Sequence, residues 1–190
     1  QIRQFKGLLR RSEARAAVQA CGLPVNRIRF LDLAFYENGR YRQFAPGDAD
    51  LAALAATLRD IAPHQLFATG HRDDPSTVAA VCFSLIQRAC RQLAGEAWLR
   101  DCRLWLYRGV DSPWNTAEID MAVPFSPREL TQKIQSIYQH KSQRSQTAVE
   151  PGLHELWQQA EHHNRSLAET YDRLGLANYE ALEAFELGEI

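Results

Sequence analysis

The stretch "QLFATGHRDDPSTVAAVC", residues 65–82, decides the fold class of this chain. It begins with a short apolar run that stops at Gly70, continues through a dense polar patch, and becomes amphipathic from Pro75. A short, nearly continuous apolar run is typical of a parallel strand that is covered on both faces. Asp74 followed by Pro75 is a typical helix start, with an N-cap residue and proline at the first helical position. The stretch therefore predicts a strand at 64–70, a polar loop and a helix.

The rest of the chain continues this alternation of helix and strand. Helical spacing, strand-like alternation and capping signals locate the remaining elements. We expect helices at about 2–21, 48–60, 75–93, 127–138, 151–174 and 178–187, and strands at about 27–35, 64–70, 102–108 and 117–125. Such alternation is typical of crossover units in an open parallel sheet. The sequence therefore predicts an α/β fold with a mostly parallel sheet flanked by helices and a helical C-terminal tail.

Composition and charge argue against several classes of function. The chain has 190 residues, is 45% hydrophobic and carries a net charge of -1, as expected of one soluble domain with or without a small appendage. A near-neutral charge gives no support for nucleic acid or an anionic membrane as the main partner. No apolar run reaches the roughly 18–20 residues of a membrane span. The cysteines show no metal-type spacing, which favours buried thiols and a reducing cytoplasm.

Polar residues at the end of the 64–70 strand form the best candidate site. Ligands of open parallel sheets bind beyond the carboxyl ends of the strands, where His71, Asp73 and Asp74 are expected. A carboxylate or imidazole at such a position can bind a metal or act as a general base. A structural interpretation stays open, because Asp74 is also the expected N-cap and Asp73 can simply be solvated.

Other histidines and arginines give weaker signals. His154 and His162 are eight residues apart, too far to hold one ion within a single helical turn, so we expect surface histidines. His140 lies near the end of its helix, where an imidazolium also suits the helix dipole. Arg10 belongs to a basic face of the first helix, which fits either a solvated surface or a site for an anionic ligand.

Six sequence blocks occur in a specific order: "RRSEARAA" (10–17), "RFLDLAFYENG" (29–39), "PHQLFATG" (63–70), "DCRLWLYRG" (101–109), "EIDMAVPFSPREL" (118–130) and "HKSQ" (140–143). In this order the blocks resemble the PIG-L/LmbE N-deacetylases. The tail at 156–185 is similar to the version in which the deacetylase module follows a glucosamine-6-phosphate deaminase/isomerase-like domain. The resemblance covers essentially the whole chain, and it is the ordered set of blocks that makes it specific.

Members of that family are Rossmann-like, zinc-dependent hydrolases that remove the acetyl group from N-acetylglucosamine-type sugars. In their chemistry the metal polarises the amide carbonyl and a bound water attacks it. An aspartate accepts the proton of that water, and a histidine helps to stabilise the oxyanion. A His-Pro-Asp-Asp motif after the first strand and a His-x-x-His motif at the start of a later helix supply these groups. The resemblance therefore implies zinc as the family's cofactor and an N-acetyl amino sugar or its phosphate as the ligand.

The chain departs from both motifs. The His-Pro-Asp-Asp motif is absent, because the chain begins at the helix that should follow it. The resemblance thus implies a Rossmann-like sheet that lacks its first strand, as in a piece of a longer protein. In the alignment fixed by Asp74-Pro75 and Val81-Cys82, the paired histidines of the family fall at Ser76 and Ala79. Alanine has no donor atom and a serine hydroxyl is a poor zinc ligand, which leaves His71 nearby as a weak substitute.

The resemblance implies a C-terminal N-deacetylase module of an amino-sugar metabolism protein related to glucosamine-6-phosphate deaminase, inactive as this chain. Its α/β core would be 1–145, with a helical extension at 146–190 packed on it. The alternative is a non-catalytic sugar-binding or structural domain with a degenerate metal site. We expect an N-terminal domain in the full-length protein, and a homo-oligomer stays open. The residues expected to line the cleft are His71, Asp73, Asp74, Ser76, Ala79, Arg10, Arg108 and His140, the last two on the strength of their matching blocks.

Overall fold

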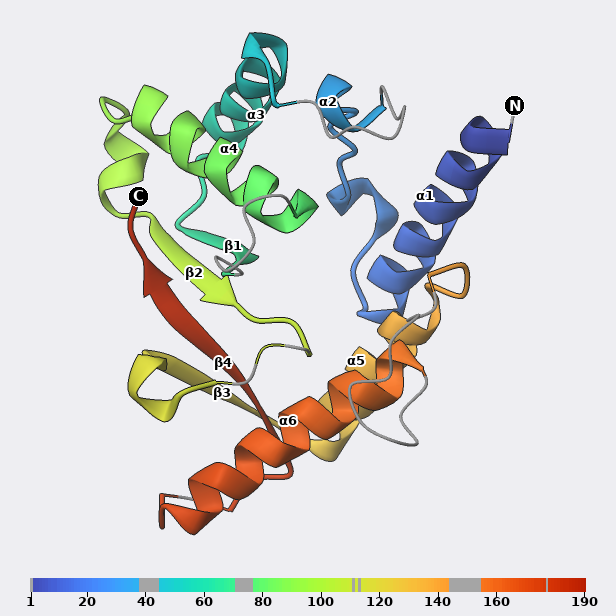
Figure 1. Cartoon of the computed structure of the whole chain (residues 1–190), viewed down its shortest axis with the longest axis vertical. Coiled ribbons are helices and arrows are strands. Elements are labelled where there is room, and N and C mark those ends of the chain that lie inside the picture. The colour runs from blue at the N-terminus through green and yellow to red at the C-terminus, as the bar shows by residue number, and fades with distance from the viewer. Residues whose placement is uncertain are drawn as a thin grey trace. The chain divides into compact units, whose positions relative to one another are not determined.

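The computed structural model describes residues 2–37, 45–70, 77–110, 112, 114–143, 155–176 and 178–190 (Figure 1). The chain divides into two compact units. The first unit comprises Gln1–Arg29 and Ala122–Glu183, and the second comprises Phe30–Met121 and Ala184–Ile190. The expected boundary near residue 145 falls inside the first unit, so the division into 1–145 and 146–190 stays a prediction.

The second unit is built around a crossover between two parallel strands. It contains α2 (Ala34–Glu37), α3 (Asp48–Ile61), β1 (Gln65–Thr69), α4 (Val78–Gln92), η2 (Ala97–Arg100), β2 (Arg103–Tyr107) and η3 (Thr116–Glu118). β1 and β2 pair in parallel with Leu66 opposite Leu104. α4 packs on β1 and α3 packs beside α4 (Figure 1). The predicted strand at the start of the deciding stretch and the helix at its end are therefore both confirmed.

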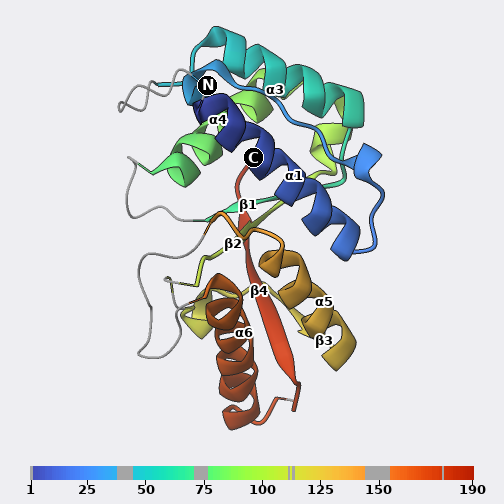
Figure 2. The same ribbon diagram turned by 90° about the vertical axis from the view of Figure 1, so that its right-hand side faces the viewer.

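The first unit is mainly helical. It contains α1 (Ile2–Ala20), η1 (Val25–Arg27), α5 (Pro127–Tyr138), α6 (Leu156–Arg173), most of β3 (Met121–Phe125) and the first residues of β4 (Ala181–Gly188). α5 packs against both α1 and α6, and the three helices can be followed in Figure 2. α5 begins at the predicted capping box, where Ser126 N donates to Glu129 Oε2 (2.8 Å) and Glu129 N donates to Ser126 Oγ (3.3 Å).

Among the described residues, four strands form a mixed sheet in the order β1-β2-β4-β3. β1 and β2 are parallel, whereas β2 and β4 are antiparallel, with Leu104 opposite Gly188. The predicted α/β class is confirmed, although the antiparallel pairing of β2 with β4 makes the sheet mixed, where a mostly parallel one was expected. The helix predicted at 178–187 is wrong, because this segment is β4. Its pairing with β2 and the burial of Leu182 override the helix propensity of its glutamates, alanines and leucines.

The strand predicted at 27–35 is also wrong. The segment is irregular from 28 to 33 and then enters the short helix α2. Asp32 has a φ of 50°, which interrupts an extended run. Phe35 is buried, and its N–H donates to Asp50 Oδ1 (3.3 Å) at the start of α3. Contact with α3 therefore holds this segment in a conformation other than a strand.

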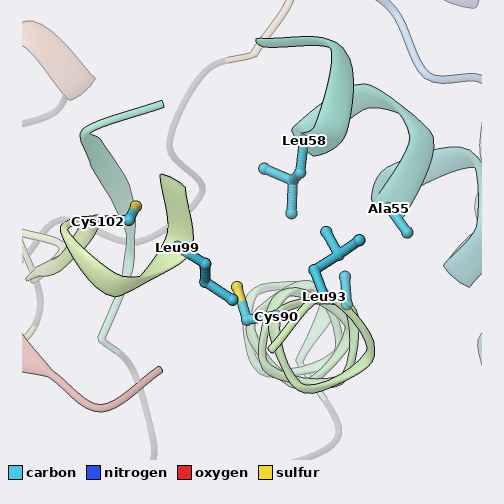
Figure 3. Close-up of a cluster of buried hydrophobic side chains, with 7 residues drawn as sticks. Ala55, Leu58, Cys90, Leu93, Leu99 and Cys102 are labelled. Carbon is cyan, nitrogen blue, oxygen red and sulfur yellow. The ribbon is translucent and has the colours of Figure 1, made fainter. Parts of the chain in front are cut away.

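The core of the second unit lies between α3, α4 and η2. Figure 3 shows the cluster formed by Ala55, Leu58, Ala89, Cys90, Leu93, Leu99 and Cys102. All four cysteines are free, and burial raises the pKa of the Cys90 and Cys102 thiols. Both belong to the core. The spacing predicted buried thiols at Cys82 and Cys90; Cys90 is buried, whereas Cys82 is half-buried. In the described parts of the chain, no helix has the length and apolarity needed to cross a membrane.

Candidate functional site

The carboxyl ends of β1 and β2 lie side by side and form the rim where the sequence predicts a site. Gly70, directly after β1, donates its N–H to the carbonyl oxygen of Tyr107 at the end of β2 (2.7 Å). A Cβ at position 70 would lie 3.0 Å from Leu106 Cβ, so this close approach favours glycine. The parallel pairing thus brings the two strand ends together as expected for a crossover fold.

The start of α4 lies after this rim. Thr77 is its N-cap, with Oγ1 accepting from Ala80 N (3.1 Å), and Val78 is the first helical residue. Ala79 therefore lies in the first turn of α4, where its methyl side chain offers no ligand atom. The candidate residues His71, Asp73, Asp74 and Ser76, and the expected helix start at Asp74-Pro75, lie outside the described residues.

Arg108 follows β2 directly and has several partners. Its Nη2 lies 2.7 Å from Glu118 Oε2 and 3.7 Å from Glu186 Oε2. Its guanidinium carbon lies 4.3 Å from the ring centroid of Trp114. Arg108 thus links the end of β2 to η3 and to β4, which assigns it a structural role at the rim. Sequence reasoning missed all three partners, because no local spacing connects them and Glu186 lies in the segment expected to be helical.

Arg10 and His140 belong to the first unit, where both lie near Glu13. Glu13 is 8% exposed, and its carboxylate accepts from Ser142 Oγ (2.6 Å) and Ser142 N (2.7 Å). The hydroxyl of Ser142 lowers the pKa of Glu13 most. The N–H of Ser142 and the charges of His140 and Arg10 lower it further, against the effect of burial. The "HKSQ" block therefore fixes the end of α5 to α1, and sequence reasoning missed the carboxylate that holds it.

One sequence signal could have shown that Glu13 lies on a buried face of α1. It precedes Ala17 by one helical turn, on the side of α1 that packs against α5. On the same side, Ser136 Oγ of α5 donates to the carbonyl oxygen of Ala17 (3.0 Å). A charged residue on a buried helix face calls for a partner, which in this protein is Ser142.

Substituting Glu13 by glutamine should change how stability depends on pH. The pKa of Glu13 is lower in the folded protein than in the unfolded chain, where it is about 4.3. The ionised carboxylate therefore stabilises the fold fully above the unfolded pKa, and this stabilisation is lost as the pH falls through the folded pKa. We expect Glu13→Gln to lower the free energy of unfolding by about 1–3 kcal/mol at pH 7. The loss should shrink as the pH falls below about 4.5, measured by urea unfolding followed by circular dichroism. Glu169→Gln, at an exposed position of α6, is the control. A constant difference across that pH range would contradict the assignment.

The described residues do not fit a zinc ion. Among them, no group of three or more histidine, cysteine, aspartate or glutamate side chains is placed to hold a metal. Ala79, at one of the two positions where the resemblance expects histidine, has no donor atom. His162 is exposed, as predicted, with its Nε2 3.3 Å from Ser166 Oγ, and His154 lies outside the described residues. We therefore derive no reaction step through a metal.

Comparisons with known proteins relate the chain to part of a longer protein. No protein-family model matches it. A glucosamine-6-phosphate deaminase-like protein of Bacteroides thetaiotaomicron is 43% identical over 187 residues, which are 97% of this chain. The chain spans 28% of the length of that relative. In structure it is similar to the 4-carboxy-2-hydroxymuconate hydratase of Pseudomonas putida, with a TM-score of 0.64, 16% identity, and coverage of 96% of this chain and 72% of the hydratase. At this identity the likeness concerns the fold alone.

Proposed function

We propose that this chain is a PIG-L/LmbE-type amino-sugar N-deacetylase module of a larger protein, and that it releases no acetate by itself. The ordered sequence blocks support the module type. The relative that is 43% identical over 97% of the chain, and that is named glucosamine-6-phosphate deaminase-like, supports the link to amino sugars. The proposed loss of activity rests on the position of Ala79, which lies in the first turn of α4, where a zinc ligand would be needed.

The charges at the rim bear on the ligand of such a module. Arg108 is shared between Glu118 and Glu186, so one positive charge meets two negative charges. A phosphate placed there would meet a net negative cluster, which disfavours it. Carboxylates are good acceptors for sugar hydroxyls. We therefore favour an uncharged N-acetyl amino sugar at this rim over a sugar phosphate bound by Arg108.

A non-catalytic sugar-binding or structural domain is the second candidate. The same alanine in α4 favours it, because a fold can keep a sugar cleft after its metal ligands are lost. Saturable sugar binding without turnover would distinguish it from a working deacetylase. A cytoplasmic location and a homo-oligomeric state stay predictions for either candidate.

Acetate release and metal content test the proposal together. We expect the longer natural protein to bind less than 0.1 zinc per chain, roughly background, and to release no acetate from N-acetylglucosamine or its 6-phosphate. The double variant Ser76→His/Ala79→His restores the two imidazoles that the resemblance expects. It should raise zinc binding at neutral pH, whereas Ser76→Asn/Ala79→Gln, which adds polar side chains without imidazole, should not. Stoichiometric, tightly bound zinc in the natural protein, with acetate release that a chelator abolishes, would overturn the proposed loss.

A further inference from the structure

A cavity of about 360 Å³ lies in the second unit at the end of α4. Its walls come from α4 and the turn after it, from η2, and from the residues before β2 and after β4. The lining residues are Cys90, Arg91, Ala94, Leu99, Arg100, Cys102 and Ile190. All of them belong to the same compact unit. The volume is in the range of small-molecule sites, about 300–1,000 Å³.

Two of the lining side chains are charged, and both are arginines. Within the described part of the chain, the guanidinium groups of Arg91 and Arg100 form no hydrogen bond or ion pair. Glu96, the acidic residue between them in the sequence, pairs instead with Arg59 (2.9 Å). Two like charges at one cavity repel each other, and a bound anion relieves this repulsion. The lining therefore favours a negatively charged ligand.

The inner wall of the cavity is uncharged. Cys90, Leu99 and Cys102, which Figure 3 shows in the buried cluster of this unit, are each less than 10% exposed. Because burial raises the pKa of both thiols, they are neutral at pH 7 and do not repel an anion. A ligand whose charged end meets the arginines can therefore place an uncharged body against the leucine and the thiols.

The cavity is separate from the rim at the carboxyl ends of β1 and β2. α4 begins after that rim at Val78 and reaches the cavity with Cys90 and Arg91. A helix of 15 residues is about 22 Å long. The two places also differ in charge, because Arg108 at the rim is shared between two glutamates. They are therefore suited to different ligands.

We propose that this cavity binds a small phosphomonoester, with the phosphate at Arg91 and Arg100 and the uncharged body against Leu99 and the two thiols. A phosphomonoester carries a charge of about −1.5 to −2 at pH 7, which matches two guanidinium groups. Its three terminal oxygens accept parallel hydrogen bonds from the guanidinium forks. A carboxylate has one charge and two oxygens, so a single arginine satisfies it. This site does not depend on the proposed deacetylase chemistry.

Thiol protection in the longer natural protein tests the proposal at the cavity itself. Alkylation of Cys90 and Cys102 by N-ethylmaleimide is followed peptide by peptide with mass spectrometry, so other anion sites do not interfere. We expect saturating propyl phosphate to slow the alkylation of both thiols about ten-fold. Butyrate at the same concentration should not slow it. Equal alkylation with and without propyl phosphate, or equal protection by butyrate, would overturn the proposal.

Substitutions of the arginines provide an independent measurement. In the longer protein, Arg91→Gln/Arg100→Gln should weaken the binding of propyl phosphate that protects the thiols about ten-fold or more, because hydrogen bonds to charged groups are lost. Arg91→Lys/Arg100→Lys keeps both charges without the forks and should fall between that variant and the natural protein. Arg27→Gln/Arg128→Gln, at two exposed positions of the first unit, is the matched control and should leave binding unchanged. Equal weakening by the control would show that net charge alone attracts the phosphate, which contradicts a built site.

Discussion

Leu106→Ala is expected to lower the free energy of unfolding by about 2–5 kcal/mol, because it opens a cavity in the buried cluster that β1 and β2 form. Leu106 is 0% exposed and lies in β2, between β1 and β4. A Cβ at Gly70 would lie 3.0 Å from Leu106 Cβ, and one at Gly188 would lie 3.0 Å from Leu106 Cγ. The leucine therefore fills the space above both glycines, and backbone on either side limits how far the cavity can collapse.

Leu187→Ala is the matched control, because it removes the same atoms from the neighbouring strand β4. Leu187 is 50% exposed, so much of its side chain already contacts water. We expect it to lose less than about 1 kcal/mol, which is usual for positions outside the core. Urea unfolding followed by circular dichroism and by tryptophan fluorescence measures both variants. Similar losses at the two positions would show that the packing around Leu106 is loose.

The sequence predicted the elements whose signals are local. β1 is a short apolar run bounded by Gly70, and α4 has apolar residues at helical spacing over four turns. The capping box at Ser126 joins residues three apart in the sequence, and the structure keeps both of its hydrogen bonds. Such signals depend on neighbours within a few residues, so they can be identified without knowledge of the tertiary structure.

Elements decided by distant contacts were not predictable in this way. β4 carries glutamate, alanine and leucine, which favour a helix locally, but it pairs with β2 about 80 residues earlier in the chain. The segment 28–33 has strand-like composition, but Phe35 next to it is held by Asp50 of α3. In both segments a partner far along the chain determines the conformation. The spacing of apolar residues within the segment does not reveal that partner.

The candidate site likewise contains features that local signals predict and features that depend on distant contacts. The rim at the end of β1 follows from fold class alone, since parallel strands end at the same edge of a sheet. The partners of Arg108 and the contact between Glu13 and Ser142 come from residues 6 to 129 positions apart. The lack of a metal ligand at Ala79 was predicted only because the family resemblance supplied an alignment in which histidine is expected at this position. The cluster at His71, Asp73 and Asp74 stays a prediction.

Asn164→Ala should be the most damaging polar substitution in the first unit, with a loss of about 2–4 kcal/mol. Asn164 is 1% exposed, and its Nδ2 donates to the carbonyl oxygen of Leu182 (2.6 Å). Its Oδ1 accepts from Lys133 Nζ (2.8 Å), and Lys133 also pairs with Glu183. This network joins α5, α6 and the start of β4. Removing the amide leaves a buried carbonyl without a donor, and each unsatisfied buried group costs about 1–3 kcal/mol.

Asn178→Ala, at an exposed position between α6 and β4, is the control and should change the free energy of unfolding by less than about 0.5 kcal/mol. Lys133→Met tests whether the network acts as a unit. It keeps an apolar side chain that is one atom shorter, but removes the charged Nζ, which lies 5.2 Å from the centroid of the Phe125 ring. Because Lys133 and Asn164 share Glu183, the two substitutions should be non-additive by at least about 0.5 kcal/mol in a double-mutant cycle. Strict additivity would mean that Asn164 acts only through Leu182, so that the ion pair between α5 and β4 is independent of α6.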